Sequence, residues 1–171
     1  MKNDDLIFSM VENVINSTAV KVLNKMTGSE FHSLSGIKRS SNDKNYITTI
    51  GLYGTKITET SHEIKIRGNI VLSWNLDVYI KISNAIFKDE YKEYCEDIKD
   101  MGMEILNTIV GNSRSELRAK GIFIEMAIPN GFIGNQISTE LPDYIMLRET
   151  TFESSLGNTQ LLVTCGVISE D

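Results

Sequence analysis

The segment from Asp100 to Gly111 is the feature that most constrains how this chain folds. On a helix, where successive residues are about 100° apart, this segment has only one narrow polar arc. The rest of its surface is apolar and consists of Met101, Met103, Ile105, Leu106, Ile109 and Val110. A helix that is apolar nearly all round has to be buried, so other elements must cover most of its surface.

A first helix is predicted from Asp4 to about Met26, where apolar residues recur on one side at helical spacing. Asp4 or Asp5 is placed to cap its start, and Gly28 is placed to end it. Such a one-sided helix packs its apolar face against a core and leaves the other face in solvent.

Two more helices follow later in the chain. Asn75 or Asp77 is placed to cap the second, which contains Val78, Ile80, Ile82 and Ile86. The third carries the apolar segment described above and is predicted to run from near Tyr91 or Glu93 to Ala119.

Runs of β-branched and aromatic residues predict five strands. These are Tyr46–Tyr53, Glu63–Trp74, Ile122–Ile128, Tyr144–Phe152 and Leu161–Ile168. The first two form a hairpin, and a turn-like segment joins the last two. We therefore predict an α+β fold in which long helices pack on one face of an antiparallel sheet. No linker rich in Pro or Gly divides the 171 residues, so residues 1–171 are expected to form a single domain.

Charge and residue usage argue against several classes of function. The net charge is -6, and the most basic stretch, Lys38 and Arg39 with Lys44 nearby, is typical of a solvated loop. Nucleic-acid binding is therefore not expected. The sequence has neither a signal-type apolar start nor a run of about 18 apolar residues, so we expect a cytoplasmic protein without membrane contact.

The cysteines and histidines do not form a recognisable site. Cys95 and Cys165 lie far apart and belong to no CxxC pair, which argues against a disulfide framework or a zinc site. His32 and His62 stand in polar contexts without a nucleophile motif, so a catalytic triad is unsupported.

The polar arc of the third helix holds the candidate site. It consists of Asp100, Glu104, Asn107, Thr108 and Gly111. Glu104 and Asn107 are three residues apart and point the same way. A glycine inside a helix costs about 1 kcal/mol relative to alanine, so something should compensate at Gly111. Close approach of another protein's backbone, a helix kink or tight internal packing would each do so.

The segment from Asp100 to Gly111, with Pro129 further on, resembles the signature of the chemotaxis phosphatases CheC, CheX and FliY. That signature has an acidic or Ser residue, then Glu, then Asn three residues later, and a downstream Pro. The opening helix and the glycine-centred strand Ile66–Trp74 are also similar to that family. Glu12 and Asn16 of the first helix have the wrong spacing for a second site. The resemblance is therefore to the single-site CheX type.

The resemblance implies a substrate, a partner and residue roles. The substrate is a phosphorylated CheY-like response regulator, whose receiver domain supplies the Mg²⁺ and an active-site Lys. Asn107 orients the attacking water, Glu104 pairs with that Lys, and Asp100, Thr108 and Gly111 contact the receiver. The chain needs no metal or cofactor of its own and forms a homodimer with one site in each chain.

Two other functions fit the same residues. A non-catalytic adaptor or sequestering module would dock a receiver through the same stripe, although binding alone does not require a carboxamide at Asn107. A structural component of a motor switch is the third possibility. Considered without the family, a Glu and an Asn on a helix are more often solvated residues than catalysts. The narrow arc, the helix-interior glycine and the downstream proline together favour a site.

Overall fold

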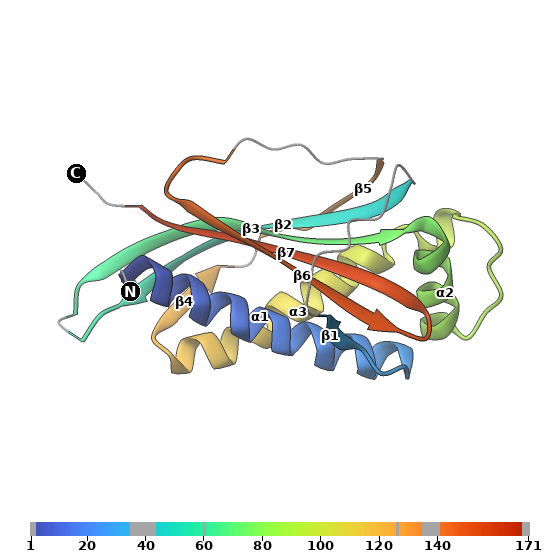
Figure 1. The fold of residues 1–171 in the computed structure, drawn as a ribbon, viewed down its shortest axis with the longest axis horizontal. Coiled ribbons are helices and arrows are strands. Elements are labelled where there is room, and N and C mark those ends of the chain that lie inside the picture. Colours follow the sequence, from blue (N-terminus) through green and yellow to red (C-terminus); the bar gives the residue numbers. More distant parts are fainter. Residues whose placement is uncertain (1–2, 35–43, 60, 126, 135–140, 169–171) are drawn as a thin grey trace.

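An antiparallel sheet forms the centre of the fold (Figure 1). The computed structural model describes residues 3–34, 44–59, 61–125, 127–134 and 141–168. Within them the strand order is β1-β6-β7-β3-β2-β4, and β5 also pairs with β2. The strands are β1 (His32–Leu34), β2 (Asn45–Ile57), β3 (Glu63–Asn75), β4 (Ile122–Glu125), β5 (Asn130–Gly134), β6 (Ile145–Ser154) and β7 (Gly157–Ile168).

Two long helices lie side by side under the sheet, as Figure 1 shows. They are α1 (Asn3–Thr27) and α3 (Met101–Ala119), and α2 (Leu76–Phe87) follows β3 at one end of the sheet. The predicted α+β fold, with an antiparallel sheet and helices on one face, is confirmed. Asn75 caps α2 as predicted, because its side chain accepts a hydrogen bond from the Asp77 N–H at 3.0 Å.

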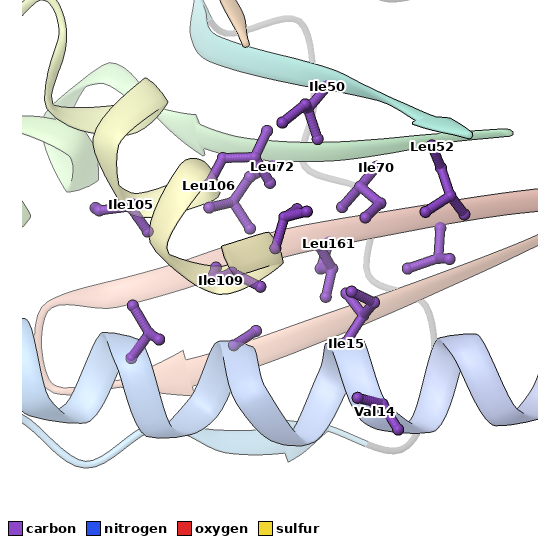
Figure 2. Close-up of a cluster of buried hydrophobic side chains, with 14 of the residues drawn as sticks. Val14, Ile15, Ile50, Leu52, Ile70, Leu72, Ile105, Leu106, Ile109 and Leu161 are labelled. Carbon is purple, nitrogen blue, oxygen red and sulfur yellow. The ribbon is translucent and has the colours of Figure 1, made fainter. Parts of the chain in front are cut away.

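The core lies between the helices and the sheet. Figure 2 shows side chains from both layers converging there, among them Val14 and Ile15 of α1, Ile105, Leu106 and Ile109 of α3, and Ile50, Leu52, Ile70, Leu72 and Leu161 of the strands. All ten are buried. Full burial of one such side chain stabilises a fold by about 1.5–3 kcal/mol, so this cluster anchors α3 against both the sheet and α1.

Helix α1 ends where the sequence predicts. Gly28 has a φ of +72° and donates its N–H to the Asn24 carbonyl at 2.9 Å. The stretch Asp4–Thr27 is long and apolar enough to cross a membrane, although 56% of its most apolar window is buried inside the fold. Helices that form the core of a folded domain have the same character, and α1 packs in this way against α3 and the sheet.

Helix α3 begins later than predicted. It starts at Met101, after a short 3₁₀ turn at Glu96–Ile98, and not near Tyr91 or Glu93. The Asn84 side chain of α2 holds Tyr91 outside the helix by binding both of its backbone groups, accepting from N–H at 2.8 Å and donating to C=O at 3.0 Å.

The strands differ from the prediction at the sheet edges. The short strands β1 and β5 are not predicted, and β4 ends at Glu125 rather than continuing to Ile128. All five residues of β5 are at least partly exposed, so no apolar alternation marks it in the sequence. Lys38 and Arg39, predicted to lie in a solvated loop, are outside the described residues.

The two C-terminal strands form the predicted hairpin, and only β6 has an outer side that is partly open. β7 pairs with β6 on one side and with β3 on the other. β1 covers β6 only at Thr151–Glu153, so within the described residues the outer side of Ile145–Thr150 has no strand partner. This first part of β6 is therefore an open edge on its side of the sheet.

Candidate functional site

The polar arc predicted on α3 faces solvent. Asp100, Glu104 and Gly111 are exposed, and Asn107 and Thr108 are partly exposed. The residues between them are buried, namely Ile105, Leu106, Ile109 and Val110. We call Asp100, Glu104, Asn107, Thr108 and Gly111 together the α3 stripe.

The Glu104 and Asn107 side chains have no hydrogen-bond or ion-pair partner among the described residues. Thr108 differs, because its hydroxyl donates to the Glu104 carbonyl at 2.8 Å, within the helix. Glu104 and Asn107 are three residues apart on one helix face, so a single ligand surface can reach both. The site therefore offers a carboxylate and a carboxamide to a molecule that binds from outside.

Gly111 has open space around it. A Cβ placed there would have no heavy atom within 4 Å, apart from the helix itself, and α3 runs through Gly111 without interruption. Tight internal packing, one of the three explanations that the sequence leaves open, therefore does not account for a glycine at this position.

Asp100 lies at the N-cap of α3, one turn before Glu104. Its carbonyl accepts the Glu104 N–H at 3.1 Å, but its side chain makes no capping hydrogen bond. The Asp100 carboxylate is therefore exposed and extends the acidic end of the α3 stripe.

The Glu and Asn of helix α1 are engaged inside the fold. The Glu12 side chain is only 8% exposed, and its carboxylate accepts from Asn16 Nδ2 at 2.7 Å and from Arg148 Nη1 at 3.2 Å. Asn16 Nδ2 also donates to Thr150 Oγ1 at 3.1 Å. These contacts tie α1 to β6, so Glu12 and Asn16 are not available at the surface as Glu104 and Asn107 of α3 are.

The sequence did not indicate what supports the start of α3. Four aromatic residues meet there, namely Tyr46 of β2, Trp74 of β3, Tyr79 of α2 and Tyr94 before α3. The Tyr46 and Tyr79 rings stack with centroids 4.1 Å apart and an interplanar angle of 17°. They come from elements distant in sequence, so no local motif could have revealed the cluster.

The described residues contain no group of three or more His, Cys, Asp or Glu side chains placed to hold a metal ion. Both cysteines are free thiols; Cys95 is partly exposed and Cys165 is buried. Burial raises the pKa of the Cys165 thiol to about 12. A buried thiol in its neutral form is a poor nucleophile.

The two thiols should therefore react very differently. At pH 8 a thiol with a pKa of about 12 is ionised in about one molecule in ten thousand, so a thiol reagent should modify Cys95 and spare Cys165. Peptide mapping by mass spectrometry would measure this, and both residues should react after unfolding in urea. Modification of Cys165 in the folded protein at the rate of Cys95 would contradict the burial.

Solved structures show the same fold. The chemotaxis protein CheX from Vibrio vulnificus superposes with a TM-score of 0.70 at 19% identity, covering 91% of this chain and 95% of that one. A CheC-like protein from Shewanella oneidensis has a TM-score of 0.70 at 20% identity, with 94% and 99% covered. CheX from Borrelia burgdorferi, in a complex with CheY, BeF3 and Mg²⁺, gives 0.67 at 18% identity, with 92% and 97% covered.

Sequence comparison identifies the family. Comparison with curated protein sequences gives no significant match. The family model described as chemotaxis phosphatase CheX matches residues 61–157, more than half of the chain and a range that includes Glu104 and Asn107. The chain therefore belongs to the CheX family of chemotaxis phosphatases.

Proposed function

We propose that this protein hydrolyses the aspartyl phosphate of a CheY-like response regulator, with Asn107 and Glu104 as the catalytic residues. The observation that carries the proposal is an exposed carboxylate and a partly exposed carboxamide, without side-chain partners among the described residues, on a part of α3 whose neighbouring residues Ile105, Leu106, Ile109 and Val110 are buried. Family membership supports the reaction class. The Borrelia CheX, crystallised with CheY, supports the kind of partner.

Hydrolysis of an aspartyl phosphate depends chiefly on placing a water molecule in line with the leaving carboxylate. The water attacks phosphorus, the bond from phosphorus to the carboxylate oxygen breaks, and free phosphate and the aspartate carboxylate are released. A carboxamide has both a donor and an acceptor, so Asn107 can hold the water without acting as a base. The Mg²⁺ belongs to the receiver, as the composition of the Borrelia complex supports.

Glu104 is assigned the docking role. Its exposed carboxylate would pair with the receiver's active-site Lys, and an ion pair at a docked interface strengthens as water is excluded. Such pairing sets the distance at which Asn107 meets the phosphoryl group. Asp100, Thr108 and Gly111 are assigned to contact with the receiver surface around this pair.

The assembly is part of the same proposal. We assign residues 1–171 to one CheX-like domain, place it in the cytoplasm, and propose a homodimer joined through the open edge of β6 at Ile145–Thr150. Each chain would then hold one site on α3. A monomeric mass in light scattering at micromolar concentration would contradict the dimer.

The decay of a radiolabelled phosphoryl group on CheY-like receivers from the same organism tests the function. Addition of the protein should accelerate the decay for at least one receiver, with release of inorganic phosphate. Binding to a phosphorylated receiver without any acceleration would instead support a non-catalytic adaptor. A binding assay on the same receivers therefore has to accompany the decay measurement.

Replacing Gly111 with Ala should stabilise the fold and weaken the enzyme. Open space surrounds the site of the added methyl group, and alanine in a helix interior is favoured over glycine by about 1 kcal/mol. The same methyl group would stand between α3 and a closely docked receiver, so KM should rise. Urea denaturation and steady-state kinetics measure the two effects.

Asn112→Ala is the matched control for Gly111→Ala, because Asn112 is exposed on α3 but lies outside the stripe. It should leave KM unchanged. An unchanged KM in Gly111→Ala would remove Gly111 from the receiver interface.

A further inference from the structure

The first turn of α3 has no side-chain cap of its own. An α-helix leaves its first four N–H groups without helical partners, and an Asp at the N-cap commonly accepts from one of them. Asp100 occupies the N-cap of α3 with φ −92° and ψ −7°, and its side chain makes no such bond. Another group has to accept a hydrogen bond from the buried N–H groups at the start of this helix.

The Tyr79 hydroxyl does so from α2. It accepts the Gly102 N–H at 3.1 Å and donates to the Ile98 carbonyl at 2.6 Å, so one buried group holds the chain on both sides of the N-cap. Tyr79 is completely buried. Burial also raises the pKa of Tyr79 far above its usual value, which keeps the hydroxyl protonated and able to donate.

Tyr46 holds the same turn from the sheet. Its hydroxyl donates to the Lys99 carbonyl at 2.5 Å, and its ring stacks on that of Tyr79. Two glycines enclose it: a Cβ at Gly102 of α3 would collide with the Tyr46 ring, and a Cβ at Gly131 of β5 would collide with its hydroxyl. These contacts therefore fix the distance between the start of α3 and strand β2.

We propose that Tyr46 and Tyr79 are positioning residues for the Glu104–Asn107 site. This inference rests on the proposed function. The two hydroxyls hold the backbone of residues 98–102. Glu104 follows one turn later, and its N–H donates to the carbonyl of Asp100 within the held segment. A shift of this turn moves the docking carboxylate and the water-holding carboxamide together. Errors of about 1 Å in such placement can lower a rate by about a hundredfold.

Tyr79→Phe and Tyr46→Phe test the proposal because each keeps its ring and removes only the hydroxyl. In each variant kcat for receiver dephosphorylation should fall by about tenfold or more. The Kd for a receiver carrying beryllofluoride should change far less, because the α3 stripe keeps its surface groups. Assays are run well below the melting temperature of every variant, so that loss of folded protein does not contribute.

Tyr94→Phe is the matched control. Tyr94 belongs to the same aromatic cluster, with its ring centroid 6.0 Å from that of Tyr46 and 6.1 Å from that of Tyr79. Among the described residues its hydroxyl makes no hydrogen bond to the start of α3, so kcat should be unchanged. Amide exchange at Gly102 should accelerate in Tyr79→Phe and stay the same in Tyr94→Phe.

A double-mutant cycle separates positioning from general weakening of the fold. Tyr79→Phe should lower kcat by a smaller factor in a Glu104→Gln background than in the wild type. In that background the Glu104 carboxylate, one of the two groups that the Tyr79 hydroxyl positions, is already absent. A merely structural role would lower kcat by the same factor in both backgrounds.

The outcomes distinguish this inference from the proposed function. Wild-type kcat in both Phe variants, or unchanged exchange at Gly102 in Tyr79→Phe, would overturn the positioning role and leave the phosphatase intact. A wild-type protein that accelerates no receiver's decay would overturn the phosphatase, and the positioning role with it.

Discussion

Replacing Asn107 with Ala is expected to lower the rate of receiver dephosphorylation by about a hundredfold or more while receiver binding stays nearly unchanged. The carboxamide is the group that can hold the attacking water, and alanine has neither a donor nor an acceptor to replace it. Asn107 is partly exposed, and its side chain has no partner among the described residues. The free energy of unfolding should therefore change by no more than about 0.5 kcal/mol.

Two other variants show whether the loss of rate is specific to Asn107. Asn112→Ala removes another exposed carboxamide of α3, five residues after Asn107 and outside the α3 stripe, and should leave the decay rate at the wild-type value. Glu104→Ala should weaken both binding and turnover, because its carboxylate is assigned to docking. Full activity in Asn107→Ala would show that the carboxamide does not orient the water.

The second large effect concerns the sheet. Gly68→Ala is expected to destabilise the fold by about 3 kcal/mol or more, or to prevent folding. Gly68 lies on β3 opposite Cys165 of β7, where both strands are paired on each side. An added Cβ would collide with the Thr164 carbonyl and lie 2.9 Å from the Cα of Cys165. These are backbone atoms, so the two strands would have to separate.

Urea denaturation of Gly68→Ala measures this loss, and Gly111→Ala provides a matched glycine. The same substitution meets backbone at Gly68 and open space at Gly111, so the two changes in stability should have opposite signs. A wild-type denaturation midpoint in Gly68→Ala would show that the strands can shift without cost.

Local periodicity accounts for what could be predicted. In α3 the apolar positions recur at helical spacing, so burial of Ile105 and Ile109 and exposure of Glu104 follow from residues a few places apart. The end of α1 at Gly28 likewise depends on the chain within one turn. These features involve neighbouring residues, which is why they can be read without knowing the rest of the fold.

The features that were missed involve residues far apart in sequence. Tyr91, where α3 was predicted to begin, is bound by the side chain of Asn84 of α2 and lies outside the helix. The short strand β5 has no apolar alternation of its own and is defined by its pairing with β2. The open edge of β6 depends on where β1 stops, which no pattern within β6 records.

By itself the sequence determined the class of fold, the α3 stripe and the Glu104–Asn107 pair, because each follows from spacing along one helix or strand. Only the tertiary structure decided how the start of α3 is held. Tyr46 and Tyr79 reach it from β2 and α2, and the glycines that admit the Tyr46 ring lie on α3 and β5. Such contacts form only when distant segments pack together, and local spacing carries no trace of them.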